Sequence, residues 1–328
     1  MDKSITKIPT LGMSRADWLA ERRKSLGGSD MGAVLGLNRF RSPYSVWADK
    51  TGKLPDAEDT EAMRIGRDLE PYVLRRFAEK SGLRTRHINA IMRNDAFPHI
   101  HANVDSVVIG QRAGVEAKTA SALNTRAFSG GDFPESYYAQ CVTYLAITGY
   151  QRWYLAVLIM GREFKIYQMT RVFNDDAPEW CEASIYVSDG EVTALAAAAA
   201  DFWRYVETNT PPPVDGLKAT GEALTAIYSQ SDGRTVDLAA VDSGIRNYLM
   251  LKKQVDELSG MMEEQKNQIM AYMEDAERGE TGNVRIIWKT QTREVFDRKS
   301  FQKAYPEIDL SLYSKTSTSR PFKLTVVK

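Results

Sequence analysis

The sequence has no excess of charge of either sign, because 43 lysines and arginines balance 43 aspartates and glutamates. Nucleic-acid-binding proteins are often basic overall, so this balance counts mildly against that class. It does not exclude the class, because binding follows the local electrostatic field rather than the total charge. Acidic residues in one part of a chain can mask a basic groove in another.

Long apolar runs and cysteines are also scarce. No apolar stretch reaches the roughly 18 residues that a membrane-spanning helix needs, so we expect no membrane span. The N-terminal residues lack the apolar centre of a signal peptide, and we therefore expect a cytoplasmic protein. The two cysteines, Cys141 and Cys181, fall in predicted helices and do not form the pattern of a disulfide framework or a zinc site.

The chain does have enough apolar sequence for a sizeable core, since 43% of its 328 residues are hydrophobic and 10% are aromatic. This length suits one large domain or two ordinary ones. A run of three prolines at 211–213 marks a boundary, and the composition changes beyond it. We predict an N-terminal arm over 1–14, a main domain over 15–210 and, over 214–328, a helical extension with a small strand-containing tail.

Residues 103–118 carry the clearest chemical pattern. They predict two short strands joined by a tight turn at Gly110 and Gly114, with Asp105 on the first strand and Glu116 and Lys118 on the second. Side chains two residues apart on a strand share a face, and a hairpin would add Asp105 to them. Two carboxylates can bind a divalent cation, and a neighbouring lysine adds charge or a proton relay beside an attacking water. The pattern suits phosphodiester hydrolysis, although a solvated hairpin has it too.

Helices before this stretch contain further candidates. Arg22 lies near the end of a helix predicted over 16–24. Ser29 follows two glycines, where the sequence fits either an anion site at a helix N-terminus or an ordinary capped turn. Glu70 lies in a long amphipathic helix predicted over 60–82, and it could face either solvent or the site.

The rest of the main domain predicts a mixture of strands and helices. A helix over 134–148 places Gln140 and Tyr144 four residues apart and therefore on one face. The other predicted elements are strands over 84–95, 99–109 and 112–118, a mobile loop over 119–133, a hairpin over 152–170 and a long helix over 178–208.

The C-terminal third predicts a long helix with a heptad pattern. Apolar side chains fall mostly at a and d spacing, at Tyr248, Leu251, Val255, Leu258, Met262, Gln265, Ile269 and Tyr272. Such a helix can form a simple packing stripe, or it can dock a partner protein or a neighbouring subunit. A strand near 284–289 follows, and then a basic tail rich in Ser and Thr that could contact DNA phosphates or be solvated.

Taken in order, these motifs resemble the lambda exonuclease/YqaJ viral recombinase family over roughly residues 15–210. The resemblance implies an α/β (α+β) fold of the PD-(D/E)xK restriction-endonuclease type, with a mixed central sheet flanked by helices. The sequence departs from the family pattern at Asn103-Val104, where the proline of the motif is absent. The motifs are Arg22…Ser29, Gly66-x3-Glu70, Asp105, Glu116-x-Lys118 and Gln140-x3-Tyr144.

The resemblance also implies a role for each residue at the acidic site. Asp105 and Glu116, assisted by the backbone carbonyl of Ala117, would hold Mg²⁺, for which Mn²⁺ can substitute. Glu70 would face a second ion, directly or through water. Lys118 would orient or deprotonate the attacking water.

A second set of residues would contact the DNA. Gln140 would hold a water or a phosphate, with Tyr144 beneath it. Arg22 and Ser29 match the family's pocket for a 5′-terminal phosphate, a dianion that suits the fork of an arginine. Met63 lies near the position of an apolar wedge that unpairs the DNA end, and core packing explains it equally well.

The implied activity is that of a 5′→3′ exonuclease on double-stranded DNA ends, which leaves 3′ single strands for a single-strand annealing protein. Arg126 would be a further phosphate contact. Relatives form closed rings around DNA, so we expect a homo-oligomer, either a trimer or a tetramer. Two alternatives are a structure-specific endonuclease with the same core and a non-catalytic module that binds DNA ends or a protein partner.

Overall fold

The computed structural model describes residues 5–56, 59–314, 320–322 and 324. It divides into two compact units, residues 1–229 and 230–328. The first unit therefore extends beyond the proline run, because α7 (Lys218–Ile227) buries Ala219 and Ala223 there. Among the described residues, no helix is long and apolar enough to cross a membrane.

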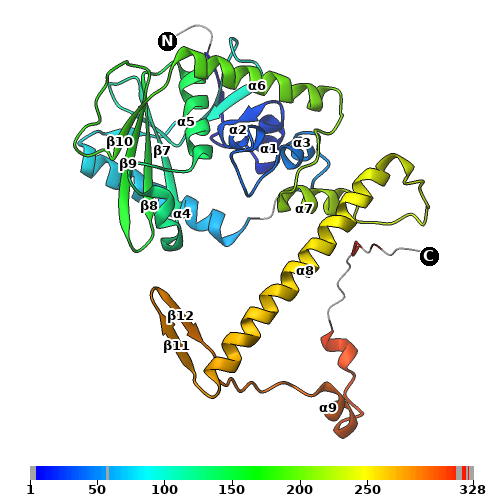
Figure 1. Ribbon diagram of the computed structural model, residues 1–328. Helices are drawn as coiled ribbons and strands as arrows, with labels where there is room; N and C mark the ends of the chain where they lie inside the picture. Colours follow the sequence, from blue (N-terminus) through cyan, green and yellow to red (C-terminus); the bar gives the residue numbers. More distant parts are fainter. Residues whose placement is uncertain (1–4, 57–58, 315–319, 323, 325–328) are drawn as a thin grey trace. The chain divides into compact units, whose positions relative to one another are not determined.

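A six-stranded mixed sheet forms the centre of the first unit (Figure 1). Strand β7 is parallel to β8 and antiparallel to β6. Helix α5 (Glu135–Thr148) lies between β7 and β8 in the chain, because a tight turn cannot join parallel strands. The strand order is β10 (Ala183–Tyr186), β9 (Glu163–Thr170), β8 (Arg152–Ile159), β7 (Ala113–Ala120), β6 (Ser106–Val108) and β3 (Thr85–Arg86).

Helices cover both faces of this sheet, because the central strands are apolar on both sides. On one face, α4 (Glu61–Ser81) buries Val73 and Phe77 against Val115 and Ile166. On the other face, α5 packs on the alternate residues of β8. The predicted class, a mixed sheet flanked by helices, is confirmed.

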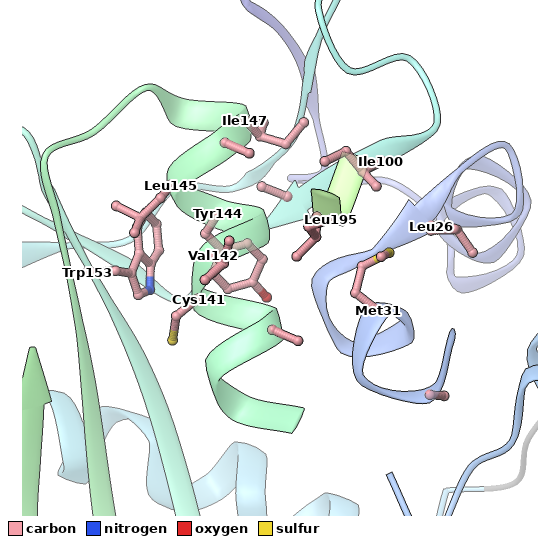
Figure 2. Close-up of a cluster of buried hydrophobic side chains, with 14 of the residues drawn as sticks. Leu26, Met31, Ile100, Cys141, Val142, Tyr144, Leu145, Ile147, Trp153 and Leu195 are labelled. Carbon is pink, nitrogen blue, oxygen red and sulfur yellow. The ribbon is translucent and has the colours of Figure 1, made fainter. Parts of the chain in front are cut away.

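Figure 2 shows how α5 lies between the sheet and α2 (Gly28–Val34). Leu145 and Cys141 lie on the face of α5 toward the sheet, where Trp153 of β8 also lies. Tyr144 turns the other way, toward Met31 of α2. All five side chains are buried. Helix α5 therefore connects the central strands to the N-terminal helices.

A smaller four-stranded sheet uses the N-terminal residues. Part of the predicted arm is a strand, since Ile5–Pro9 pairs antiparallel with β4, and the rest of that arm before residue 5 lies outside the described residues. The strand order is β1 (Ile5–Pro9), β4 (Ala90–Asn94), β5 (Ile100–Asn103) and β2 (Leu26–Gly27). The remaining helices of this part of the first unit are α1 (Arg15–Arg23) and α3 (Pro43–Lys50).

Two predicted elements differ from the structure. The segment 119–133 is not simply a loop, because it contains the 3-10 helix η1 (Ala122–Phe128), whose last residue is buried. The helix predicted over 178–208 begins only at Asp189, as α6 (Asp189–Glu207), because the preceding residues pair with β9 as strand β10.

Two smaller predictions also need correction. Cys181 precedes β10 and lies outside any helix, and both cysteines are free. Gly114 does not form the turn with Gly110, because it lies inside β7. There a Cβ atom would stand 2.3 Å from the ring of Trp153, so the glycine permits the close approach of that ring.

The second unit contains the predicted long helix, α8, and the predicted strand near 284–289, β12. The heptad side chains on α8 are exposed; Leu258, for example, is 59% exposed. The elements of this unit are η2 (Ala239–Val241), α8 (Asp242–Met273), β11 (Arg278–Thr281), β12 (Val284–Ile287), α9 (Arg298–Ala304) and η3 (Leu310–Tyr313).

Candidate metal centre and adjoining cavity

The acidic site forms on β7 and on the turn before β6. Glu116 and Lys118 share a face of β7, and Lys118 Nζ lies 2.5 Å from Glu116 Oε1. Asp105 reaches the same strand, because its carboxylate accepts the backbone N–H of Ala117 at 2.8 Å. The register that pairs Ser106 with Val115 places Asp105 beside these residues. The structure thus brings together the three side chains that the sequence predicted to converge.

Burial changes the proton affinity of all three groups. Burial and the nearby Asp105 carboxylate raise the pKa of Glu116 to about 8. Burial also raises the pKa of Asp105, against the opposing effects of Lys118 and the Ala117 N–H. Burial alone would lower the pKa of Lys118, but Glu116 and Asp105 outweigh it and the net shift is upward. The carboxyl groups are therefore short of positive charge, despite the lysine.

Helix α5 supplies a polar side to this site. Gln140 Nε2 donates to Glu116 Oε1 at 2.7 Å and lies 2.8 Å from the hydroxyl of Tyr144. That hydroxyl donates to the backbone carbonyl of Asn103 at 3.1 Å. Gln140 and Tyr144 share one helix face, as predicted, and they fix the position of the carboxylate that Glu116 presents.

Glu70 faces the site from α4. Burial and the Asp105 carboxylate raise its pKa, whereas His87 and Lys118 oppose the shift. Its Oε1 lies 3.7 Å from His87 Nδ1, a neighbour that the sequence did not indicate. Asp105 and Lys118 both act on the pKa of this carboxyl group, so Glu70 lies within electrostatic range of the acidic site.

The donor set at Asp105 and Glu116 fits a divalent cation. Glu116 Oε2 is buried without a hydrogen-bond partner among the described residues, so it is an oxygen free to ligate. Hard cations such as Mg²⁺ take carboxylate and carbonyl oxygens and keep several waters. Within the described residues, no three His, Cys, Asp or Glu side chains are grouped closely enough to hold one ion. An ion held here would therefore also need the Ala117 carbonyl and water as ligands.

A cavity of about 1200 Å³ lies in the same unit, and Arg22, Ser29 and Met63 all line it. Arg22 Nη2 stands 3.5 Å from Ser29 Oγ. The Arg22 guanidinium stacks 4.5 Å above the ring of Trp18, which also lines the cavity. Residues that are distant in sequence thus form one basic, partly aromatic pocket.

A network of ion pairs that the sequence did not indicate lies in the wall of this cavity. Lys50 Nζ donates to the backbone carbonyl of Arg22 at 2.9 Å and pairs with Asp30 at 2.7 Å. Arg41 pairs with Asp30 and, at 2.9 Å, with Asp49. Burial alone would raise the pKa of Asp30, but Arg41 and Lys50 outweigh it and hold the pKa far below its usual range. No spacing rule links these residues, because they come from three separate segments.

The structure separates the two remaining candidates. Met63 is 46% exposed and lines the cavity, so core packing does not explain it. Arg126 is exposed on η1, does not line the cavity and has no ion pair within the described part of the chain. Nothing in the structure brings Arg126 to either the acids or the cavity.

The first turn of α2 connects the cavity to the acidic site. A Cβ atom on Gly28 would stand 2.7 Å from the Tyr144 ring and 3.1 Å from Gln140 Cγ. Only glycine allows this approach, because any side chain would collide with Tyr144 and with Gln140, which donates to Glu116. Ser29, on the cavity side, is the next residue, so the two regions share one tightly packed contact.

The fold and the site together define a class: an α+β chain with two carboxylates and a lysine gathered at its central strands. The model of the YqaJ-like viral recombinase domain matches residues 17–151. A protein of Bacillus subtilis (strain 168), named "Uncharacterized protein YqaJ", is 34% identical over 322 residues, which cover 96% of this chain and 95% of that one. The chain belongs to the YqaJ-like viral recombinase family.

Some solved structures are also similar, at a greater distance. An alkaline exonuclease (LHK-Exo) from Laribacter hongkongensis has a TM-score of 0.46 and 15% identity, covering 60% of this chain and 94% of that one. A phage-related exonuclease from Haemophilus somnus has a TM-score of 0.37 and 9% identity, covering 56% of this chain and 96% of that one. Family membership does not depend on them, because the Bacillus relative establishes it.

Proposed function

We propose that this protein is a Mg²⁺-dependent 5′→3′ exonuclease that hydrolyses phosphodiesters from 5′-phosphorylated ends of double-stranded DNA and leaves 3′ overhangs. The convergence of Asp105, Glu116 and Lys118 carries the proposal. Glu116 presents a buried carboxylate oxygen that has no hydrogen-bond partner in the described part of the chain, next to a lysine, and metal-dependent phosphodiester hydrolysis uses such a group.

Each residue then has a defined task. Asp105, Glu116 and the Ala117 carbonyl would hold the cation, and Glu70 would face a second ion position. When bound, Mg²⁺ supplies charge that stabilises the attacking and leaving oxygens of an in-line displacement. Lys118 adds positive charge beside the attacking water and orients it. Gln140 fixes Glu116 by its hydrogen bond.

The cavity supports action at DNA ends. The Arg22 guanidinium and the Ser29 hydroxyl face each other in a basic pocket, where they can bind a terminal phosphate. A terminal phosphate is a dianion, which an internal phosphodiester is not, and a guanidinium fork discriminates between them. Met63, exposed in the same cavity, fits an apolar contact to an unpaired terminal base.

Digestion of a linear duplex tests the proposal. Substrates labelled at the 3′ end, with and without a 5′ phosphate, are incubated with Mg²⁺ or with a chelator. We expect digestion only with Mg²⁺ and faster digestion with the phosphate, and we expect the 3′ label to remain on strands that shorten from their 5′ ends. Failure to degrade any DNA would contradict the proposal and favour a binding module.

A circular duplex separates the exonuclease from an endonuclease with the same core. The exonuclease requires an end, so covalently closed circles survive prolonged digestion. Nicking or linearisation of these circles at the rate of linear DNA would overturn the end requirement. Arg22→Gln provides the matching variant, because it should remove the preference for a 5′ phosphate and leave the acidic site unchanged.

We also propose a closed homo-oligomer, a trimer or a tetramer, that works with a single-strand annealing protein. A ring suits a chain without net charge, because encircling the duplex replaces electrostatic attraction. Sedimentation equilibrium of the full chain tests the assembly, and a monomer at micromolar concentration contradicts it. Co-sedimentation with the annealing protein of the same phage-type system tests the partner.

A further inference from the structure

The α9 segment, residues 288–305 in the second unit, carries cations that have no acidic partner. These are Lys289, Arg293, Arg298, Lys299 and Lys303, all exposed and all without an ion pair within the described part of the chain. The segment contains two acids, and one of them, Asp297, caps α9 by accepting the backbone N–H groups of Lys299 and Ser300 at 3.0 and 3.1 Å. The segment is therefore locally basic in a chain that is neutral overall.

Helix α8 in the same unit shows that these free cations are not a general feature. Its Arg246, Lys253 and Lys266 pair with acids on the same helix, at distances of 2.6, 3.7 and 2.8 Å. Helix α8 thus pairs three of its four basic side chains with its own acids, whereas the α9 segment leaves its charge available to an anionic ligand.

Aromatic rings lie among the free cations. Phe296 and Phe301 have ring centroids 5.1 Å apart, and Phe301 and Tyr305 are also 5.1 Å apart. Phe301 and Tyr305 are four residues apart and share a face of α9. Phe296 is 68% exposed and Tyr305 50% exposed, and Trp288 at the start of the segment is also exposed. The rings form a short, open row rather than a core.

From these observations we infer that the α9 segment binds single-stranded DNA, with its rings stacking on bases and its cations contacting phosphates. Alternating aromatic and basic side chains are the means by which proteins hold single strands without reading sequence. A duplex offers phosphates but keeps its base faces covered, so it would not use the rings. A lipid surface is less suitable, because the segment has only Val295 as a branched aliphatic side chain.

The role of this binding rests on the proposed function, because digestion of one strand leaves its complement single-stranded. The α9 segment would hold that released strand. The binding itself can be measured without any cleavage. A failure of the nuclease proposal and a failure of this inference are therefore distinguishable.

The experiment uses the full chain in a chelator and a fluorescent 20-nucleotide single strand without a 5′ phosphate, so that the Arg22 cavity is not engaged. The Phe296→Ala/Tyr305→Ala variant should bind it roughly tenfold more weakly, or worse, because stacking is lost. Lys299→Gln/Lys303→Gln should also weaken binding, and should reduce the slope of log affinity against log salt by about 1.4 for two phosphate contacts.

Matched controls on α8 make the same chemical changes elsewhere. These are Tyr272→Ala, at a side chain that is 92% exposed, and Lys252→Gln/Lys253→Gln. We expect wild-type affinity from both, and wild-type digestion of a short blunt duplex from all four variants. Unchanged single-strand binding in the α9 variants, equal losses in the α8 controls, or an equal loss of duplex binding in the α9 variants would overturn the inference. The inference would also be overturned if the α9 variants kept their affinity for single strands and lost binding only to vesicles of anionic phospholipid.

Discussion

The two units of this chain treat charged and apolar side chains in opposite ways. The first unit buries charge: Glu116 is 2% exposed and Asp30 is 1% exposed. The second unit exposes apolar groups: Leu258 is 59% exposed and Met262 is 74% exposed. Buried charges are costly unless they are paired or ligated, and extended exposed apolar rows mark contact surfaces. The first unit thus keeps charged side chains in its interior, and the second leaves rows of apolar side chains on its surface.

Removal of the site lysine should give the largest difference between the units. We expect Lys118→Ala to reduce DNA digestion by roughly 10³-fold, because it removes the one cation that pairs with Glu116 among the residues that the structure describes. Lys253→Ala on α8 makes the same change on the surface of the second unit and should leave the rate unchanged. Initial rates on a 5′-phosphorylated duplex measure both. Full activity of Lys118→Ala would refute our assignment of the site.

Buried and exposed ion pairs should differ strongly in stability. Lys50→Met leaves Asp30 buried without one of its partners, and should lower the free energy of unfolding by about 3–5 kcal/mol. Lys266→Met breaks an exposed pair with Glu263 and should change it by less than about 0.5 kcal/mol. Denaturant titration measures both. Lys50 contacts the backbone of Arg22, so we expect it to position that arginine for a 5′ phosphate. Lys50→Arg keeps the charge and should retain more of the preference for a 5′ phosphate than Lys50→Met. Equal losses in the two variants would contradict this positioning role.

Replacement of a glycine by alanine should lower the stability of the first unit and raise the stability of the second. Gly28→Ala places a Cβ atom 2.7 Å from the Tyr144 ring, and should destabilise the first unit by about 1–3 kcal/mol and slow digestion. Gly260 in α8 has open space around it, so Gly260→Ala should stabilise that helix by about 0.4–1 kcal/mol. Thermal unfolding followed by circular dichroism distinguishes the two. A neutral Gly28→Ala would show that α2 and α5 can move apart freely.

Mild acid should destabilise the first unit through His101. Burial, and then the nearby cation of Lys50, lower the pKa of His101 to about 3, from an unfolded value near 6.5. The unfolded chain binds this proton below about pH 6.5 and the folded chain does not, so stability falls as the pH drops from 6.5 toward 3. The loss should be about 1 kcal/mol at pH 5.5. His101→Leu should flatten this slope, and an unchanged slope would assign it to other groups.

Local patterns made the acidic site predictable. The two-residue spacing of Glu116 and Lys118 fixes their common face on any strand, and the four-residue spacing of Gln140 and Tyr144 does the same on a helix. The buried network at Asp30, Arg41 and Lys50 could not be predicted, because its pairs join segments with no shared period. The strand before α6 was missed for a similar reason, since its pairing with β9 overrides local helix preference.

The close contact between Gly28 of α2 and Tyr144 has a consequence for the length of the DNA products. Gly28 presses on Tyr144, Tyr144 is hydrogen-bonded to Gln140, and Gln140 holds Glu116. Under the proposed function, the Arg22–Ser29 pocket would receive the 5′ end and the carboxylates would face the bond that is cut, so this series of contacts would fix the distance between the two positions. An exonuclease with a fixed distance between these two positions would remove products of constant length, whatever their sequence. A uniform product length would therefore follow from the close packing at Gly28, the first residue of α2, which leaves no room for a methyl group.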